Sequence, residues 1–279
     1  MTISGHAAVA AVMGWPVSHS RSPRLHGFWL EAYGIDGAYV PLPVAPEGFE
    51  RALRSLAALG LKGCNVTLPH KEATLALADE ADGVARRIGA ANTVIVTDEG
   101  SLRVTNTDAF GFIENLDQRA PHWKREQPAV VLGAGGASRA VIVALLEAGV
   151  PELRLANRTA ERGQALADEF GTRVQATAWE ERSSALDGAG LLVNTTQLGM
   201  TGQPELEIAL DPLGQDAVVY DLVYAPLETD LLHRAGALHL TTVDGLGMLL
   251  HQARPGFAAW FGHEPEVTGA LYAYVAEGL

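Results

Sequence analysis

The residues with the clearest capacity for chemistry surround one lysine. Lys71 ends the stretch Asn65-Val66-Thr67-Leu68-Pro69-His70-Lys71, and the 279-residue chain has only three lysines, at positions 62, 71 and 124. An ammonium group can lose its proton when it is desolvated, whereas a guanidinium effectively cannot. Lys71 is therefore a candidate for proton transfer. This segment alone leaves open the alternative of a solvated lysine at a helix start.

Three further polar clusters lie at the ends of expected strands or helices in the first half of the chain. They are Gly14-Trp15-Pro16-Val17-Ser18-His19-Ser20-Arg21-Ser22-Pro23, Gly89-Ala90-Ala91-Asn92-Thr93 and Asn106-Thr107-Asp108. Two serines one residue apart at a helix start can bind a carboxylate with help from the helix amides. Asn and Asp at such positions are often only turn residues. Together, however, the clusters offer the hydroxyls, amides, lysine and carboxylate that suit a small polyhydroxylated acid.

A glycine-rich turn in the second half predicts a nucleotide site. The apolar run 129–132 leads into Gly133-Ala134-Gly135-Gly136-Ala137-Ser138, and a helical pattern continues to about Ala148. Glycines let backbone amides approach a pyrophosphate, and the helix N-terminus presents free N–H groups to it. Because tight turns between a strand and a helix often use glycine, a purely structural turn is the alternative.

The end of the next expected strand favours NADP over NAD. Units that bind NAD usually carry an acidic residue here, which accepts from the ribose 2′-hydroxyl. This chain has Asn157-Arg158-Thr159 instead, and Arg162 follows. An arginine can pair with a 2′-phosphate. Two arginines at a helix start are unfavourable for the helix dipole unless an anion is present, so NADP is preferred over two plain surface charges.

Short apolar runs alternate with helical patterns along the chain, which predicts an α/β protein with a mostly parallel sheet. Strands are expected at 7–13, 37–44, 62–66, 129–132, 152–156, 191–194 and 217–221, with helices between the later ones. A hairpin is expected over 93–97 and 102–105. Helices are expected from Ser22, as N-cap, to Tyr33 and over 46–59, 246–261 and 267–277. The polar, proline-bounded segment 121–128 is the predicted linker.

Composition excludes several classes of function. The formal charge of −13 argues against a general affinity for nucleic acid or anionic membrane. Cys64 is the single cysteine, which rules out an internal disulfide and a multi-cysteine metal site, and the histidines show no metal-ligand spacing. The chain has no apolar run of about 18 residues and no positively charged segment before Val9–Met13. We expect a soluble cytoplasmic protein without a bound metal.

Eight short motifs, in order along nearly the whole chain, together resemble the NADP-linked shikimate dehydrogenase family. They are G-x-P-x-x-H-S-x-S-P at 14–23, N-V-T-x-P-x-K at 65–71, G-A-x-N-T at 89–93, N-T-D-x-x-G at 106–111, G-A-G-G-A at 133–137, N-R-T at 157–159, D-L-V-Y-x-P at 221–226 and G-L-G-M-L-x-x-Q at 245–252. The resemblance implies NADPH-dependent, reversible reduction of 3-dehydroshikimate to shikimate, a step in chorismate and aromatic amino acid biosynthesis.

The resemblance also implies a two-domain architecture. Residues 1–109 would form an α/β domain that binds substrate and carries the catalytic residues. Residues 110–243 would form a Rossmann-like, doubly wound NADP domain. Residues 244–279 would be C-terminal helices that return to the first domain. Oligomeric state is not readable from the sequence, so a monomer and a homodimer are both open.

Roles for individual residues follow from the resemblance as expectations. Lys71 would be the general acid and base, paired with Asp108. The substrate carboxylate and hydroxyls would be bound by Ser20, Ser22, Thr67, Asn92, Asp108, Tyr224 and Gln252. NADP would be held by Gly133, Ala134, Gly135, Gly136, Ala137, Asn157, Arg158, Thr159 and Arg162, with Leu222 and Gly245 along its nicotinamide side.

Three positions depart from the family pattern, and other functions remain open. Gly27 stands where asparagine commonly follows His26, Gln197 stands where serine or proline is usual, and Arg254-Pro255-Gly256 interrupts an apolar segment. A quinate/shikimate dehydrogenase of broader specificity is the nearest alternative. A non-catalytic NADP(H)-binding regulatory module is an alternative of another class. A folate-linked dehydrogenase is remote, because the Ser-x-Ser cluster does not support it.

Overall fold

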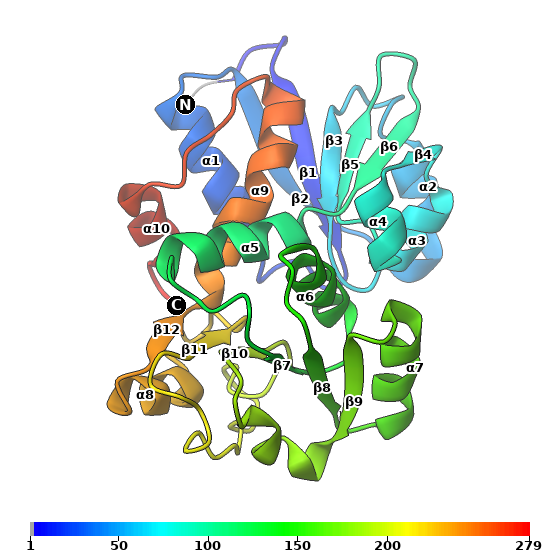
Figure 1. Cartoon of the computed structure of the whole chain (residues 1–279). Coiled ribbons are helices and arrows are strands. Elements are labelled where there is room, and N and C mark those ends of the chain that lie inside the picture. The colour runs from blue at the N-terminus through cyan, green and yellow to red at the C-terminus, as the bar shows by residue number, and fades with distance from the viewer. Residues whose placement is uncertain (1–2) are drawn as a thin grey trace. The chain divides into compact units, whose positions relative to one another are not determined.

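The computed structural model describes residues 3–279, which divide into two compact units (Figure 1). Unit 1 contains residues 3–108 together with Leu249–Glu277. Unit 2 contains Ala109–Met248 together with Gly278–Leu279. Each unit is built around a six-stranded sheet of its own.

The sheet of unit 1 is mixed, with strand order β2-β1-β3-β5-β6-β4. β1 runs parallel to β2 and β3, whereas β5 is antiparallel to both β3 and β6. The antiparallel pair β5–β6 is the predicted hairpin. Pro41 and Pro43 are accommodated because β2 is an edge strand. The strands are β1 (Ala8–Gly14), β2 (Gly37–Pro43), β3 (Gly63–Val66), β4 (Glu80–Ala81), β5 (Thr93–Val96) and β6 (Leu102–Thr105).

Helices cover both faces of this sheet, because consecutive side chains of β1 and β3 are buried and point to opposite faces. Ala11, Met13 and Cys64 point to the face on which Phe49 and Leu53 pack. Tyr39 points to the opposite face, where its ring stacks on His26 of the first helix. The helices are α1 (Ser22–Ala32), η1 (Pro46–Gly48), α2 (Phe49–Arg54), α3 (Lys71–Leu77), α4 (Gly83–Ile88), the unit 1 part of α9 (Gly245–Phe261), and α10 (Gly269–Ala276).

The C-terminal helices return to the first sheet, as expected. The Trp260 indole N–H donates to the carbonyl oxygen of Val94 on β5 at 2.9 Å. A Cβ on Gly63 would lie 2.4 Å from the Trp260 Nε1, and one on Gly256 would lie 2.8 Å from the Trp260 ring. Two glycines therefore let the indole reach the sheet. One of them, Gly256, belongs to the Arg254-Pro255-Gly256 departure from the family pattern.

The sheet of unit 2 is fully parallel, with strand order β12-β11-β10-β7-β8-β9. This order is the doubly wound dinucleotide-binding topology, and its switch point lies between β7 and β10. The strands are β7 (Ala129–Leu132), β8 (Leu153–Asn157), β9 (Val174–Ala178), β10 (Leu191–Asn194), β11 (Val218–Asp221) and β12 (Thr241–Val243). The helices are α5 (Asp108–Arg119), α6 (Gly136–Glu147), α7 (Ala160–Phe170), η2 (Trp179–Glu181), η3 (Ser184–Leu186) and α8 (Asp230–Ala237).

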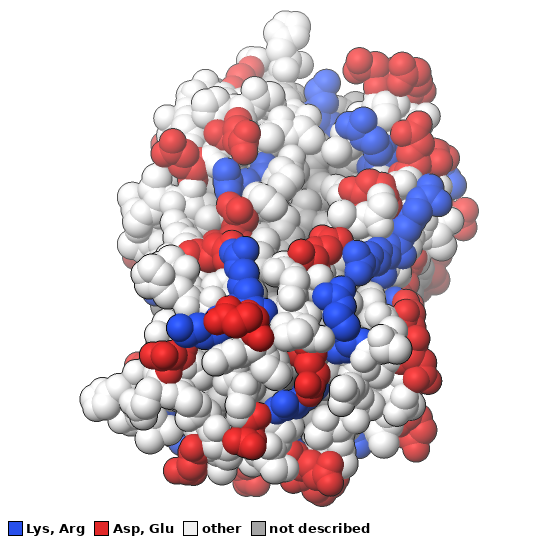
Figure 2. Space-filling model, in the orientation of Figure 1, with Lys and Arg blue, Asp and Glu red and all other residues white. Residues whose placement is uncertain are grey.

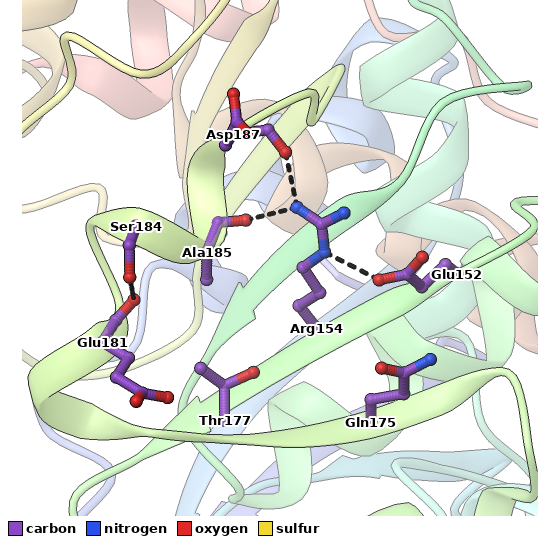
Figure 3. Close-up of a pocket in the computed structure, with 8 residues that line it drawn as sticks. All are labelled: Glu152, Arg154, Gln175, Thr177, Glu181, Ser184, Ala185 and Asp187. Atoms are coloured by element: carbon purple, nitrogen blue, oxygen red, sulfur yellow. Dashed lines mark hydrogen bonds and ion pairs between the residues drawn. The ribbon is translucent and has the colours of Figure 1, made fainter.

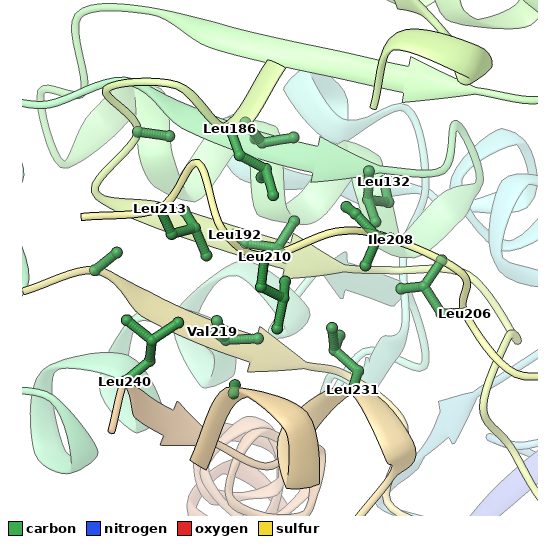
Figure 4. Close-up of a cluster of buried hydrophobic side chains, with 14 of the residues drawn as sticks. Leu132, Leu186, Leu192, Leu206, Ile208, Leu210, Leu213, Val219, Leu231 and Leu240 are labelled. Carbon is green, nitrogen blue, oxygen red and sulfur yellow. The ribbon is translucent and has the colours of Figure 1, made fainter. Parts of the chain in front are cut away.

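One face of the second sheet is covered by a loop rather than by the helix expected between β10 and β11 (Figure 4). Leu206, Ile208 and Leu210 point from this loop into a cluster with Leu132, Leu192 and Val219 of the strands. Apolar residues at every second position fit an extended chain rather than a helix. Pro204 and Pro212 also disfavour a helix here.

Other local predictions need correction. The segment 121–128 is not a linker: it lies inside unit 2, and Trp123 is buried and donates to Asp117 at 2.7 Å. Ser22 is the first helical residue rather than the N-cap, because Leu25 N already bonds to the carbonyl of Arg21, the cap residue. The helix expected over 46–59 is only η1 and α2, which end at Arg54 in a series of turns. Within residues 3–279, no helix has both the length and the apolar character needed to cross a membrane.

Candidate functional site

Four chain segments of unit 1 meet at one edge of its sheet because of the strand directions. β1, β3 and β6 end at this edge, and the antiparallel β5 begins there. Asn65 on β3 pairs with Thr93 on β5, and Thr93 pairs with Thr105 on β6. The polar clusters that follow β1, β3 and β6, and the cluster that precedes β5, therefore converge on one place.

Lys71 and Asp108 form the ion pair that the family resemblance implies. Lys71 is the first residue of α3, and its Nζ lies 2.5 Å from Asp108 Oδ2. The two side chains are 22% and 11% exposed, so the pair is largely shielded from water. Asp108 Oδ1 accepts a second hydrogen bond from Asn92 Nδ2 at 2.8 Å. This is not the solvated lysine of the alternative interpretation, and the carboxylate is held at both oxygens.

Asn92 is the centre of a buried polar network that includes the C-terminal helix. Its Oδ1 accepts from the Thr93 hydroxyl and from the Thr107 N–H, both at 2.9 Å. Its Nδ2 lies 3.4 Å from Oε1 of Gln252, which α9 contributes. Asn92, Asp108 and Gln252 are each less than 10% exposed. Residues 160 positions apart in sequence are thus brought together in unit 1.

The two serines and Thr67 belong to neighbouring loops of the same edge. Ser20 Oγ accepts from the Ser22 N–H at 3.3 Å, and the Ser22 hydroxyl bonds to the Tyr39 hydroxyl. Thr67 N donates to the carbonyl of Met13, the residue before the end of β1, at 2.9 Å. The Thr67 methyl occupies the space that a Cβ on Gly14 would need, at 2.4 Å. Ser22 is buried, whereas Ser20 and Thr67 are half-buried.

In unit 2 the glycine turn has the form that a pyrophosphate site requires. Gly133 has φ +105°, and a Cβ there would lie 2.8 Å from Thr195 Oγ1. Gly135 and Gly136, by contrast, are exposed, and no atom lies within 4 Å of the Cβ position of either. Gly136 and Ala137 start α6, so their N–H groups have no partner within the helix. The open backbone and free amides at this helix start fit an anionic ligand.

The residues after β8 fit a phosphate on the ribose. Asn157 Oδ1 accepts from Ala134 N at 3.0 Å, and its Nδ2 donates to the Thr159 carbonyl at 2.8 Å, so this side chain braces the glycine turn. Arg158 and Arg162 are exposed at the start of α7, and neither side chain forms an ion pair with another described residue. Two unneutralised cations at the positive end of a helix are stabilised by a bound anion.

Leu222, Tyr224 and Gly245 also belong to unit 2. A Cβ on Gly245 would lie 2.1 Å from the Leu222 carbonyl oxygen, so these two residues are in close contact. The loop that carries Leu222 and Tyr224 follows Asp221, whose carboxylate accepts from Asn194, Thr229 and the Val223 N–H. Burial raises the pKa of Asp221 to about 6, although these three hydrogen bonds oppose the shift.

The structure therefore groups Lys71, Ser20, Ser22, Thr67, Asn92, Asp108 and Gln252 in unit 1, and Tyr224 with the cofactor candidates in unit 2. Sequence reasoning gave no individual role to Thr107, Asn65 or Tyr39, although all three are buried in the unit 1 network. Tyr39 donates to Asn65 Oδ1 at 2.6 Å, and Asn65 Nδ2 donates to Thr93 Oγ1 at 3.2 Å. Asn65 lies in the motif at 65–71 and Thr107 in the motif at 106–111. Membership of these motifs was the only feature of the sequence that pointed to the two residues.

Other features of the surface do not compete with these two sites. A hollow on unit 2 is lined by Arg154, whose guanidinium is already bonded to Glu152 and to the carbonyls of Ala185 and Asp187 (Figure 3). Acidic and basic side chains are interspersed over the face shown in Figure 2. Among residues 3–279, no three His, Cys, Asp or Glu side chains are grouped so as to hold a metal ion.

Comparison with known proteins assigns both units. Residues 12–94 match the family model described as the shikimate dehydrogenase substrate binding domain, and residues 115–210 match the model described as shikimate / quinate 5-dehydrogenase. The shikimate dehydrogenase (NADP(+)) of Paramagnetospirillum magneticum is 58% identical over 274 residues, which cover 98% of this chain and 99% of that protein.

Solved structures of similar proteins cover the same length. Shikimate 5-dehydrogenase from Thermus thermophilus, solved in complex with NADP(H) and shikimate, is 39% identical with a TM-score of 0.87, covering 98% of this chain and 100% of that chain. Quinate dehydrogenase from Corynebacterium glutamicum, solved in complex with NAD, is 32% identical with a TM-score of 0.90. The match covers 96% of this chain and 98% of that chain. The motifs, the two folds and these relatives agree, and the chain belongs to the shikimate dehydrogenase family.

Proposed function

We propose that this chain is an NADP-dependent shikimate dehydrogenase, an oxidoreductase that reversibly reduces 3-dehydroshikimate to shikimate in the shikimate pathway. The observation that carries the proposal is the Lys71–Asp108 pair, set in a buried network of amides and hydroxyls at the edge of unit 1. A shielded lysine and carboxylate beside many neutral polar groups fit proton transfer on a small polyhydroxylated acid.

The substrate is proposed to bind in unit 1, which takes the place of the domain expected over residues 1–109 and includes Leu249–Glu277 of the C-terminal segment. Ser20 and Ser22, at the start of α1, would bind its carboxylate, because hydroxyls and helix-start amides stabilise an anion. Thr67, Asn92, Asp108 and Gln252 would bind its hydroxyls. We also propose Tyr224 of unit 2 as a substrate ligand, on the family resemblance alone.

Lys71 is proposed to act as the general acid in reduction and as the general base in oxidation. The carbonyl oxygen gains negative charge as it is reduced, and an ammonium within hydrogen-bond reach can neutralise it by donating a proton. Asp108 orients that ammonium through Oδ2 while Asn92 fixes Oδ1. General acid–base assistance of this kind is typically worth about 10²–10⁴-fold in rate.

NADP is proposed to bind unit 2, within residues 110–243 and Gly245. When bound, NADPH supplies the hydride for the reduction. Gly133, Ala134, Gly135, Gly136 and Ala137 would face the pyrophosphate through their backbone. Arg158 and Arg162 would pair with the 2′-phosphate, beside Asn157 and Thr159, while Leu222 and Gly245 would line the nicotinamide side.

The compartment, the oligomeric state and the absence of nucleic-acid binding are also proposed. We propose a small-molecule enzyme of the cytoplasm that acts as a monomer or a homodimer and does not bind nucleic acid. The net charge of −13 supports the last point, because nucleic acid would be repelled. The single cysteine, buried on β3, fits a reducing compartment.

Initial rates test the proposal against its alternatives. Purified protein should reduce NADP⁺ rapidly with shikimate and slowly with quinate, and should use NAD⁺ poorly with either acid. Comparable turnover of quinate, or a preference for NAD⁺, would instead support a quinate/shikimate dehydrogenase of broader specificity. Binding of NADP⁺ without turnover of either acid would support a regulatory module.

A further inference from the structure

We infer that Thr107 is a positioning residue that fixes the orientation of the Gln252 side-chain amide and thereby sharpens recognition of the substrate hydroxyls. This inference rests on the proposed function. Thr107 lies between β6 and α5, directly before Asp108, and its side chain is 3% exposed. Its hydroxyl lies within hydrogen-bond distance of Asn92, Thr93 and Gln252.

The Thr107 hydroxyl has one proton and three acceptors within reach, namely Asn92 Oδ1, Thr93 Oγ1 and Gln252 Oε1. Asn92 Oδ1 has two lone pairs. One accepts the Thr93 hydroxyl and the other accepts the Thr107 backbone N–H, both at 2.9 Å. The Thr93 proton is thereby used, and Thr93 Oγ1 accepts from Asn65 Nδ2 at 3.2 Å. The Thr107 hydroxyl also lies 3.1 Å from Asn92 Oδ1, whose two lone pairs are already used, and 3.3 Å from Thr93 Oγ1. Because an amide carbonyl is a better acceptor than a hydroxyl oxygen, the Thr107 proton is assigned to Gln252 Oε1, at 3.3 Å.

The same count shows what this bond does for Gln252. Its Oε1 receives the Thr107 hydroxyl and, at 3.4 Å, Asn92 Nδ2. Its Nε2 has two protons, and one goes to the carbonyl of Leu249 in its own helix, at 3.1 Å. One N–H donor therefore remains for a ligand. Because the two ends of an amide have similar shapes, only such partners prevent the group from turning over and presenting its oxygen instead.

Replacing Thr107 with valine isolates the hydroxyl. Thr107→Val keeps the branched shape and the backbone N–H to Asn92, but removes the hydroxyl that donates to Gln252. Losing a hydrogen bond to a buried acceptor typically costs about 1–2 kcal/mol, which corresponds to roughly 5–30-fold in affinity. We expect KM for shikimate to rise by about that factor, with kcat within about threefold and KM for NADP⁺ unchanged.

Two further variants separate positioning from a structural role. Thr107→Ser retains the hydroxyl and loses the methyl group, so it should restore KM for shikimate to within about twofold of wild type. In a Gln252→Ala background, Thr107→Val should add less than about twofold, because the residue it acts through is gone. A full additional effect in that background, or a failure of Thr107→Ser to restore KM, would overturn the inference.

The outcome is distinguishable from failure of the proposed function. A wild-type protein that oxidises shikimate with NADP⁺, alongside a folded Thr107→Val variant with unchanged KM, would sink this inference alone. Thermal unfolding of each variant identifies loss of fold. A wild-type protein that neither binds nor oxidises shikimate would sink the proposed function, and this inference with it.

Discussion

The Trp260 indole N–H donates to the Val94 carbonyl across 166 positions of sequence, at 2.9 Å. This bond anchors α9 on the sheet of unit 1, and Gln252 lies on the same helix, about two turns before Trp260. Gln252 in turn contacts Asn92. Asn92 lies between α4, which ends at Ile88, and β5, which begins at Thr93. The position of a proposed substrate ligand thus depends on a tryptophan that has no chemical role.

Gly63→Ala should therefore destabilise unit 1 severely. Gly63 has φ +150°, and an added Cβ would lie 2.0 Å from the Val94 carbonyl oxygen and 2.4 Å from Trp260 Nε1. Backbone strain and a clash of this kind cost about 3 kcal/mol or more. Urea unfolding should show that loss as a lower midpoint. Tryptophan fluorescence should report the exposure of Trp260 to solvent. An unfolding midpoint equal to that of wild type would refute the packing described for α9.

Gly27→Ala should have the opposite effect. Gly27 lies exposed in the middle of α1, and no atom lies within 4 Å of its Cβ position. Alanine in a helix interior is more stable than glycine by roughly 0.5–1 kcal/mol. We expect the free energy of unfolding to rise by that amount and the kinetic constants to stay unchanged. A decrease in the free energy of unfolding would contradict this packing, because it would mean that a side chain at position 27 meets an obstacle.

Sequence and structure agree where a residue's role depends on local chemistry. The glycine turn and Arg158 could be interpreted from strand and helix ends alone, because a phosphate site is built from one turn. The network around Asn92 could not, since Asn92, Asp108 and Gln252 meet only through an antiparallel β5 and a returning α9.

Two of the failed predictions have identifiable physical causes. The segment 121–128 has the polar, proline-bounded composition of a linker, but the burial of Trp123 overrides that composition. The crossover between β10 and β11 was expected to be helical, yet Leu206, Ile208 and Leu210 alternate as an extended chain does. In the first place tertiary burial decides the structure, whereas in the second the alternating apolar residues were a local sign of an extended chain.

Arg158→Ala should weaken NADP⁺ binding selectively. If the guanidinium pairs with the 2′-phosphate, its loss removes a charge-assisted hydrogen bond and should raise KM for NADP⁺ by roughly tenfold or more. KM for NAD⁺, which lacks that phosphate, should change less than about twofold. Arg125→Ala is the matched control, because Arg125 is exposed in the same unit but pairs with Asp117. Equal losses for both cofactors would remove Arg158 from the phosphate site.

His26 should make unit 1 less stable as the pH falls. Burial lowers the pKa of His26 to about 3, from about 6.5 in an unfolded chain. Below pH 6.5 the unfolded state therefore binds a proton that the folded state does not, so stability is lost as the pH falls from 6.5 toward 3. The slope is at most about 1.4 kcal/mol per pH unit.

The test for His26 compares slopes rather than absolute stabilities. His26→Phe keeps a planar ring against Tyr39 but cannot titrate, so urea unfolding between pH 5 and pH 6.5 should depend less on pH than in wild type. His251, whose pKa burial lowers to about 4, is present in both proteins and accounts for a remaining slope. Identical pH dependence in the two proteins would mean that His26 is not held neutral by burial.

The kinetics of Lys71→Ala with shikimate and NADP⁺ test directly whether Lys71 transfers the proton. We expect kcat to fall by about 10²-fold or more, while KM for shikimate stays within a few-fold, because the lysine acts mainly in the transition state. A large rise in KM at near-normal kcat would contradict it, and would make Lys71 a ligand of the substrate rather than its acid.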